Sequence, residues 1–384
     1  MPLKNKLTRN IFYCYLPIVV LFATIRMLSH FGILDFLGQS GKIILNCVIQ
    51  IGLLFSISIF LFSFFQKTTI RETFKFYGFR KISLKSILIS ILIGVIVYVL
   101  NIFVATLFNS IISLFGYKFT SSTISGPQPI WVLFVNLFLT AVLPAICEET
   151  AHRGMLLKGL SPLGRKWAII ISSIMFGLLH LNIEQFFYAT IIGLLLGYIS
   201  TLCETIYPAM IIHFMNNAIS VIMSFSRTNN WGIDGVFNSL GNFMTNSPVL
   251  GFIFIFLLII LLLFLLRYLI SLLFKDTALK KINQLQNVLF KEIARENYFK
   301  EIDDISKGNY EKPNNHISFE EFDKLYKIKS FDMGHISGLD NHIIFNEEKY
   351  KMDIVTKALM ITVFILTGAI TLFTLIWGII IWLI

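Results

Sequence analysis

The sequence is poor in charge. Only 14% of its 384 residues are Asp, Glu, Lys or Arg, whereas a soluble globular protein carries about a quarter. Hydrophobic residues make up 56%, and the mean hydropathy is +0.76. Several continuous apolar runs reach roughly the 20 residues that a helix needs to cross a bilayer. The composition therefore excludes an ordinary soluble domain. It predicts an all-α fold, a polytopic helical membrane protein with about eight or nine transmembrane helices.

Cysteine is also scarce, and its placement indicates neither a disulfide framework nor a metal cluster. The four cysteines fall in or beside apolar runs, and no pair has the spacing of metal ligands. No basic run is interleaved with aromatic residues, so we expect no nucleic-acid partner. The first apolar stretch lacks a small-residue cleavage site, and Arg26 interrupts it. We therefore expect an uncleaved membrane helix there rather than a signal peptide.

Nine apolar segments are candidates for membrane spans. They lie at residues 11–33, 43–65, 86–116, 130–159, 166–182, 186–203, 207–225, 249–273 and 355–383. A polar insert with an amphipathic beginning and no recognisable chemical motif separates the last two. The predicted regions are N-terminal helices in 1–129, a core in 130–225, a loop and helix in 226–273, the insert in 274–353 and a last helix in 354–384.

Basic residues gather in alternate loops. They occur at the N-terminus, after the segments 43–65 and 130–159, and at the start of the insert. Because Lys and Arg accumulate on the cytoplasmic side of membrane proteins, we expect a cytoplasmic N-terminus and insert and an outward C-terminus. The many Ile, Lys, Asn and Phe residues are typical of a low-GC host, so the expected location is a bacterial cell membrane.

Acidic residues are almost absent from the apolar segments. The chain has only seven up to residue 274, and only Glu148 and Glu149 lie inside an apolar run. A carboxylate within the membrane costs at least ~2.5 kcal/mol and is a functional hypothesis by default. Arg153 follows Glu149 at i+4, so these two side chains can pair on one helical face. Glu148 then points elsewhere. The alternative is a purely structural polar cluster of all three.

His180 lies late in the segment 166–182. The midpoint between residues 148 and 180 falls in the turn SPLGRK (161–166), so an antiparallel hairpin brings Glu148 and His180 to the same depth. A carboxylate beside an imidazole is an arrangement that activates water. Taken alone, a single histidine in a membrane helix is often only hydrogen-bonded to a neighbour.

The segment 207–225 adds an imidazole and a carboxamide. His213 and Asn217 are four residues apart and share a helical face, and Asn216 at i+3 can substitute. N–H groups on one face are plausible donors to an oxyanion. Interhelical hydrogen bonding is an equally good explanation of this pair alone. Together, the polar residues of the core predict hydrolysis, with Glu148 and His180 activating water and His213 and Asn217 stabilising the oxyanion.

Three motifs on successive segments carry a family resemblance. They are EETAHR (148–153), FGLLH (176–180) and HFMNN (213–217). In this order they resemble the signature EExxxR, FxxxH and HxxxN of the CPBP family, the CAAX proteases and bacteriocin-processing enzymes also called Abi, which includes the type II CAAX prenyl endopeptidase. The similarity covers about residues 130–225. It implies an intramembrane endopeptidase of the glutamate type, with Glu148, His180, His213 and Asn217 in the roles given above and Glu149 and Arg153 in support.

The resemblance leaves the cofactor and one residue open. Family members have been described as metal-dependent, and Glu148, His180 and His213 are possible zinc ligands. No HExxH motif is present, and we favour a mechanism without a metal or other cofactor. His152 stands where the family usually has an aromatic residue. It can pair with Glu148 and disturb the assignment of the base, add a proton relay, or stack as an aromatic ring.

Two alternatives compete with a protease. One is a non-catalytic membrane scaffold, with a bacteriocin-immunity or regulatory role. The other is a transporter that uses the polar cluster as a relay, although no second copy of the cluster is present, as paired halves would require. For the protease, the expected partners are the lipid bilayer and a hydrophobic, prenylated or membrane-tethered peptide substrate.

Overall fold

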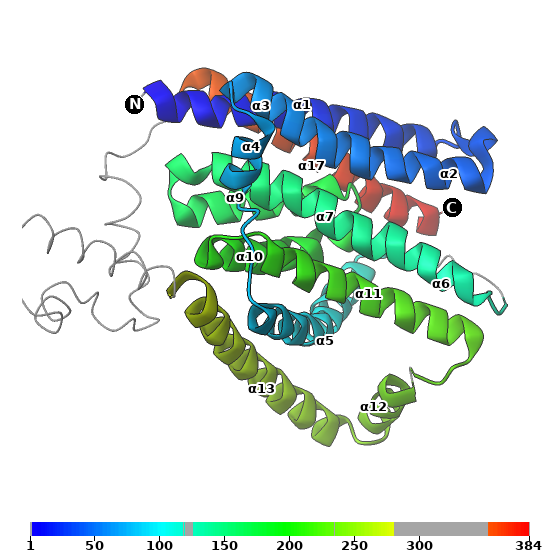
Figure 1. Ribbon diagram of the computed structural model, residues 1–384. Coiled ribbons are helices and arrows are strands. Elements are labelled where there is room, and N and C mark those ends of the chain that lie inside the picture. The colour runs from blue at the N-terminus through cyan, green and yellow to red at the C-terminus, as the bar shows by residue number, and fades with distance from the viewer. Residues whose placement is uncertain (1, 118, 120–125, 234, 280–351, 384) are drawn as a thin grey trace, which may run out of the picture. The chain divides into compact units, whose positions relative to one another are not determined.

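A computed structural model describes residues 2–117, 119, 126–233, 235–279 and 352–383 (Figure 1). These residues form helices and connecting turns and contain no strand, so the predicted all-α polytopic membrane fold is confirmed. Among the described residues, eight helices are long and apolar enough to cross a membrane: Lys6–His30, Asp35–Gln66, Leu84–Leu114, Ile130–Gly159, Ile183–Cys203, Tyr207–Asn229, Pro248–Ala278 and Ile354–Trp377.

The N-terminal part consists of long apolar helices and one short polar helix. Their bounds are α1 (Pro2–His30), η1 (Asp35–Leu37), α2 (Gly38–Cys47), η2 (Val48–Ile57), α3 (Ser58–Gln66), α4 (Ile70–Tyr77) and α5 (Leu84–Leu114). The second span, α2–η2–α3, contains a π-helical stretch in its middle, η2. The short helix α4 begins with a capping box between Thr69 and Glu72, which supplies partners for its free N–H groups.

The central part carries the three motifs. Its first span is a continuous helix made of α6 (Ile130–Leu137), η3 (Phe138–Val142), α7 (Leu143–Glu149), η4 (Thr150–Leu156) and α8 (Leu157–Gly159). After the 3-10 turn η5 (Ser161–Leu163) come α9 (Arg165–Leu179), α10 (Ile183–Cys203) and α11 (Tyr207–Asn229). Helix α10 packs along α9, and α11 packs along α5 and α7. The motif helices therefore adjoin one another.

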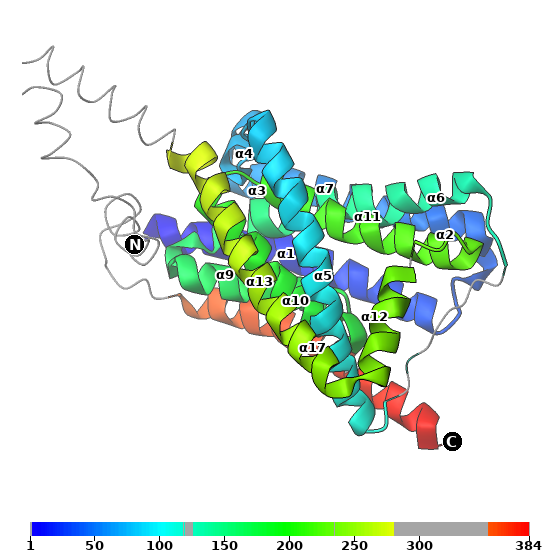
Figure 2. The same cartoon turned by 90° about the horizontal axis from the view of Figure 1, so that it is seen from below.

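The remaining helices belong to the C-terminal part of the chain. They are α12 (Gly235–Asn246), α13 (Pro248–Phe274), the π-helical turn η6 (Lys275–Leu279) and α17 (Ile354–Leu383). Helix α13 runs beside α5, and α17 lies beside α1 (Figures 1 and 2). Only 6% of the residues in the apolar stretch of α13 are buried. This helix therefore presents most of its surface outward, as expected of a lipid-facing helix. Most of the expected insert, 274–353, lies outside the described residues.

The expectation of a full span at residues 166–182 is wrong. The corresponding helix, α9, has 15 residues and ends at Leu179, which gives it a length of about 22 Å, short of the roughly 30 Å of hydrocarbon. Leu181 has a left-handed backbone with φ 50°, a conformation that terminates a right-handed helix. The Asn182 side chain then accepts from the Glu184 N–H and starts α10. His180 therefore caps α9 rather than lying within a helix.

Contacts between loops agree with the predicted alternation of sides. Thr8 donates to the carbonyl of Gly159 at 3.3 Å, and Arg80 pairs with Glu204 at 2.8 Å. These contacts join loops that were expected on the same side of the membrane. On the other side, the Tyr117 hydroxyl donates to Glu184 at 2.9 Å. Helix α9 lies between the two ends of the molecule at which these contacts occur, although it is shorter than the expected span. Which side faces the cytoplasm stays a prediction.

Candidate active site

The span Ile130–Gly159 carries the paired glutamates on an irregular helix. Glu148 and Glu149 end α7, and the π-helical stretch η4 follows at once and contains Arg153. Short π-helical stretches are frequent at functional sites. Helix α4 packs against η4 through the ring of Tyr77. An added Cβ on Gly154 would lie 2.9 Å from this ring. The motif helix is therefore held tightly at its end.

Glu149 and Arg153 form a buried ion pair, which confirms the predicted i,i+4 pairing. Arg153 Nη1 lies 2.9 Å from Glu149 Oε1, and both side chains are almost fully buried. The Arg153 guanidinium also stacks on the ring of Phe176, 4.3 Å from its centroid. His213 Nδ1 lies 2.9 Å from the same Glu149 oxygen. Glu149 thus pairs with Arg153 on its own span and contacts His213 on α11.

Glu148 is turned away from the Glu149–Arg153 pair, as the helical geometry predicts. Its Oε1 accepts a hydrogen bond from Gln50 Nε2 at 3.0 Å, and its Oε2 lies 4.0 Å from His213 Nε2. The side chain is 14% exposed, whereas that of Glu149 is completely buried. Two adjacent glutamates therefore have different environments. Glu149 is neutralised by arginine, and Glu148 faces a pocket with a neutral amide beside it.

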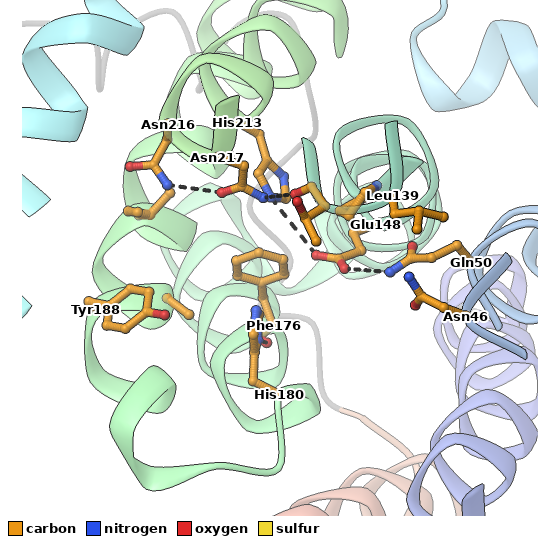
Figure 3. A pocket seen from close by; sticks show the side chains of 14 residues that line it. Asn46, Gln50, Leu139, Glu148, Phe176, His180, Tyr188, His213, Asn216 and Asn217 are labelled. Atoms are coloured by element: carbon orange, nitrogen blue, oxygen red, sulfur yellow. Dashed lines mark hydrogen bonds and ion pairs between the residues drawn. The ribbon is translucent and has the colours of Figure 1, made fainter. Parts of the chain in front are cut away.

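His180 lies at the end of α9 and faces the same pocket (Figure 3). Its Nδ1 lies 2.9 Å from the carbonyl of Phe176, and because a carbonyl only accepts, Nδ1 carries the proton. The Nε2 lone pair of a neutral His180 is then available to accept. An added Cβ on Gly177 would lie 2.1 Å from Thr190 Oγ1, so this glycine permits the close approach of α9 and α10 that fixes His180.

Helix α11 contributes three polar residues. His213 reaches both glutamates, as described above. Asn217 Nδ2 donates to the carbonyl of Thr140 at 3.0 Å, which leaves its second N–H for another acceptor. Asn216 Nδ2 donates to Asn217 Oδ1 at 3.0 Å and so holds the neighbouring carboxamide in place. His213, Asn216 and Asn217 all line the pocket.

One pocket of about 220 Å³ gathers these side chains (Figure 3). Glu148, His180, His213 and Asn217, which the sequence analysis singled out, line it together, and Glu149 and Arg153 are buried behind it. Phe176 of the FGLLH motif also lines the pocket, and the residues that the sequence analysis did not point to are Asn46, Gln50, Leu139, Thr140, Pro144, Tyr188, Ala189 and Ile192. Asn46 and Gln50 are polar residues at i,i+4 in an apolar run, a signal that was available in the sequence.

His152 does not pair with the Glu148 carboxylate. Its Nδ1 donates to the backbone carbonyl of Glu148 at 2.8 Å, and its Nε2 accepts from the Tyr15 hydroxyl at 3.0 Å. The ring makes edge contacts with Tyr15 and Phe176. Of the alternatives for this residue, aromatic packing is the one that the geometry supports.

We expect the double variant Tyr15→Phe/His152→Phe to be nearly as stable as the wild type. Both groups are fully buried, so His152→Phe alone leaves a hydroxyl unsatisfied and lowers the free energy of unfolding by about 1–3 kcal/mol, while removing both partners is nearly neutral. Unfolding in mixed micelles, followed by circular dichroism, measures this. Equal losses in the single and double variants would contradict the hydrogen-bonded pair.

The pocket does not present an assembled zinc site. Within the described part of the chain, no group of three or more His, Cys, Asp and Glu side chains is placed to hold a metal ion. Glu148 Oε2 and His213 Nε2 are 4.0 Å apart, and His213 Nδ1 is engaged by Glu149, which leaves Nε2 as the ring nitrogen open to a metal. If zinc were bound, Glu148, His180 and His213 would hold it, and it would polarise the water. The roles proposed below need only the side chains. Chelation tests the zinc alternative directly.

Comparison with known proteins finds one family. Residues 129–219 match the family model described as Type II CAAX prenyl endopeptidase Rce1-like. Neither the curated proteins nor the solved structures contain a match to the chain. The matched segment begins one residue before α6 and contains all three motifs, α9, α10 and the first part of α11. The resemblance to the CAAX-protease family is thereby confirmed for residues 129–219, which are similar to CAAX protease-like intramembrane peptidases of the Rce1-like type.

Proposed function

We propose that this protein is a glutamate-type intramembrane endopeptidase that hydrolyses peptide bonds of membrane-tethered or hydrophobic peptides. One observation carries the proposal: Glu148, His180, His213 and Asn217, contributed by three different helical segments, line a single pocket. Each of these groups is costly in a membrane. Their convergence on one pocket is explained by chemistry on a bound substrate better than by packing.

Glu148 and His180 activate the water in this proposal. The Glu148 carboxylate has no cationic side chain paired with it in the described part of the chain, apart from the imidazole of His213 at 4.0 Å, so it is free to take a proton. The water oxygen attacks the scissile carbonyl carbon while its proton passes to Glu148. The same proton then reaches the departing amine as the C–N bond breaks. His180, with its Nε2 lone pair toward the pocket, accepts a hydrogen bond from the water and orients it.

His213 and Asn217 stabilise the oxyanion. Asn217 has one N–H that is not used by Thr140. His213 Nδ1 lies 2.9 Å from the Glu149 carboxylate and donates to it, and donation from Nε2 to the oxyanion requires a second proton on the ring. Glu149 is therefore a supporting residue, and its pairing with Arg153 keeps it in place. Removal of one oxyanion donor typically costs about 10²–10³ in kcat.

The proposed substrates carry an apolar segment or a lipid. The rings and aliphatic side chains of Phe176, Tyr188 and Ile192 line the pocket beside the polar groups. The family description adds prenylated C-terminal CAAX sequences as a substrate class to test. We also propose that the N-terminus faces the cytoplasm of a bacterial cell, because the contacts between loops agree with the alternation that the basic residues predict.

Peptide cleavage by the purified full chain tests the function. We expect the wild type in nanodiscs to cleave a fluorogenic farnesylated or hydrophobic peptide, and His180→Ala to lower kcat by about 10²-fold because the water loses its orienting acceptor. The rate should not change when a strong chelator is added. Loss of activity with chelator and recovery with zinc would move Glu148, His180 and His213 into a metal site. A fully active His180→Ala variant would contradict the assigned role.

A further inference from the structure

A side chain outside the family-matched segment contacts the proposed base. Gln50 lies in η2, in the second membrane span, and is only 7% exposed. Its Nε2 donates to Glu148 Oε1 at 3.0 Å across 98 positions of sequence (Figure 3). Residues 129–219, which match the family, do not include it. The pocket is therefore completed by a helix that the resemblance does not cover.

The orientation of the Gln50 amide follows from its partner. A carboxylate only accepts hydrogen bonds, so the amide nitrogen faces Glu148 and the amide oxygen points away. That oxygen, Oε1, is buried and has no hydrogen-bond partner in the part of the chain that the structure describes. A buried amide with one unsatisfied end costs free energy. Packing alone would favour an apolar residue at this position, so the contact with Glu148 is the feature that explains Gln50.

The contact orients the carboxylate without neutralising it. Gln50 holds Oε1 from one side, while His213 Nε2 lies 4.0 Å from Oε2 on the other. A lysine or arginine in place of Gln50 would pair with Glu148 as Arg153 pairs with Glu149, and would lower its basicity. A neutral donor fixes the geometry and leaves the negative charge available to take a proton. The helix η2 packs directly against α7, which carries Glu148.

We propose that Gln50 is a positioning residue that holds the Glu148 carboxylate in its water-activating orientation. The proposal rests on the proposed function, in which Glu148 is the general base. It also gives the second membrane span a role in the active site. The π-helical form of η2 is consistent with such a role, because π-helical stretches mark functional positions.

The experiment compares Gln50→Met with the matched control Gln66→Met in the full chain in nanodiscs. Gln66 lies at the end of the same span and outside the pocket, so both variants replace glutamine by a side chain of similar length. We expect Gln50→Met to lower kcat for a farnesylated fluorogenic peptide by about 10- to 100-fold with little change in KM, because a small misplacement of a catalytic group costs up to about 10²-fold. Gln66→Met should behave as the wild type.

A second readout needs no turnover. Dicyclohexylcarbodiimide modifies protonated carboxyl groups in membranes, and mass spectrometry measures the labelling rate at Glu148. Loss of the donor to the charged form should make labelling about tenfold faster in Gln50→Met than in the wild type or Gln66→Met. A purely structural Gln50 would leave this rate unchanged. If the wild type cleaves no peptide, the labelling rates still decide whether Gln50 controls this carboxylate.

The outcomes separate this proposal from the function on which it rests. If Glu148→Gln is inactive while Gln50→Met keeps both the wild-type kcat and the wild-type labelling rate, the positioning role is wrong and the proposed function stands. If Glu148→Gln keeps full activity, the assignment of Glu148 as base fails, whatever Gln50 does. Slow turnover and fast labelling confined to Gln50→Met support the proposal.

Discussion

Replacing Glu148 with glutamine should lower kcat for peptide cleavage by about 10³-fold, within the range of 10²–10⁴ that a general base contributes. The change keeps the shape of the side chain and removes only its ability to take a proton. Hydrogen bonding to Gln50 can persist through the new amide oxygen. We therefore expect an unchanged melting temperature beside the lost activity, measured as turnover of the fluorogenic peptide and as thermal unfolding in detergent.

Glu149→Gln is the matched control for this variant. It also replaces a glutamate by a glutamine, at the next residue of the helix. Glu149 pairs with Arg153, so this variant removes one partner of a buried ion pair. Here the loss should appear in stability as well as in rate. If Glu148→Gln cleaved the peptide as fast as the wild type in the same preparation, the base would have to be another group, and a scaffold or transporter role for the cluster would gain support.

Arg153→Met should destabilise the protein by about 3–5 kcal/mol, the cost of leaving one member of a buried ion pair without its partner. Arg153 is 1% exposed and Glu149 is fully buried, so neither charge can turn to water. The variant also loses the stacking on Phe176. Reversible unfolding in mixed micelles of dodecyl sulfate and a mild detergent, followed by circular dichroism, gives the difference in the free energy of unfolding.

The double variant Glu149→Met/Arg153→Met is the control for charge. Replacing both members of a buried pair by apolar side chains is often neutral, so stability should return to within about 1 kcal/mol of the wild type. Activity should not return, because His213 loses the carboxylate that holds its Nδ1. Single and double variants that were equally unstable would show that packing of Arg153, and not its charge, supports the helix.

The sequence predicts the motif helix and the pairing on it well, because both depend on local spacing. The i,i+4 geometry places Arg153 beside Glu149 and turns Glu148 away, and the structure has both features. Equal distance from the turn at residues 161–166 places Glu148 and His180 at one depth, and both line the pocket. These inferences need only the rise and rotation of a helix.

Other features depend on contacts that spacing does not encode. The end of α9 at Leu179 follows from the left-handed backbone of Leu181, and leucine gives no sign of that conformation. Gln50 meets Glu148 across 98 positions, so only the three-dimensional packing of η2 on α7 reveals the contact. His152 finds its partner Tyr15 in the first span. The last two are tertiary contacts between spans, and the first is a backbone conformation that the residue type does not indicate.

The most direct test of Glu148-dependent hydrolysis is product analysis by mass spectrometry. The full-length wild type and Glu148→Gln are incubated in nanodiscs with the same farnesylated peptide, in ¹⁸O-water and with a chelator present. Water activation by Glu148 predicts cleavage at one amide bond by the wild type, a new carboxyl group that carries the heavy isotope, and cleavage by the variant that is about 10³-fold slower. An intact peptide after prolonged incubation with folded wild type, or the same products formed at the wild-type rate by Glu148→Gln, would contradict it.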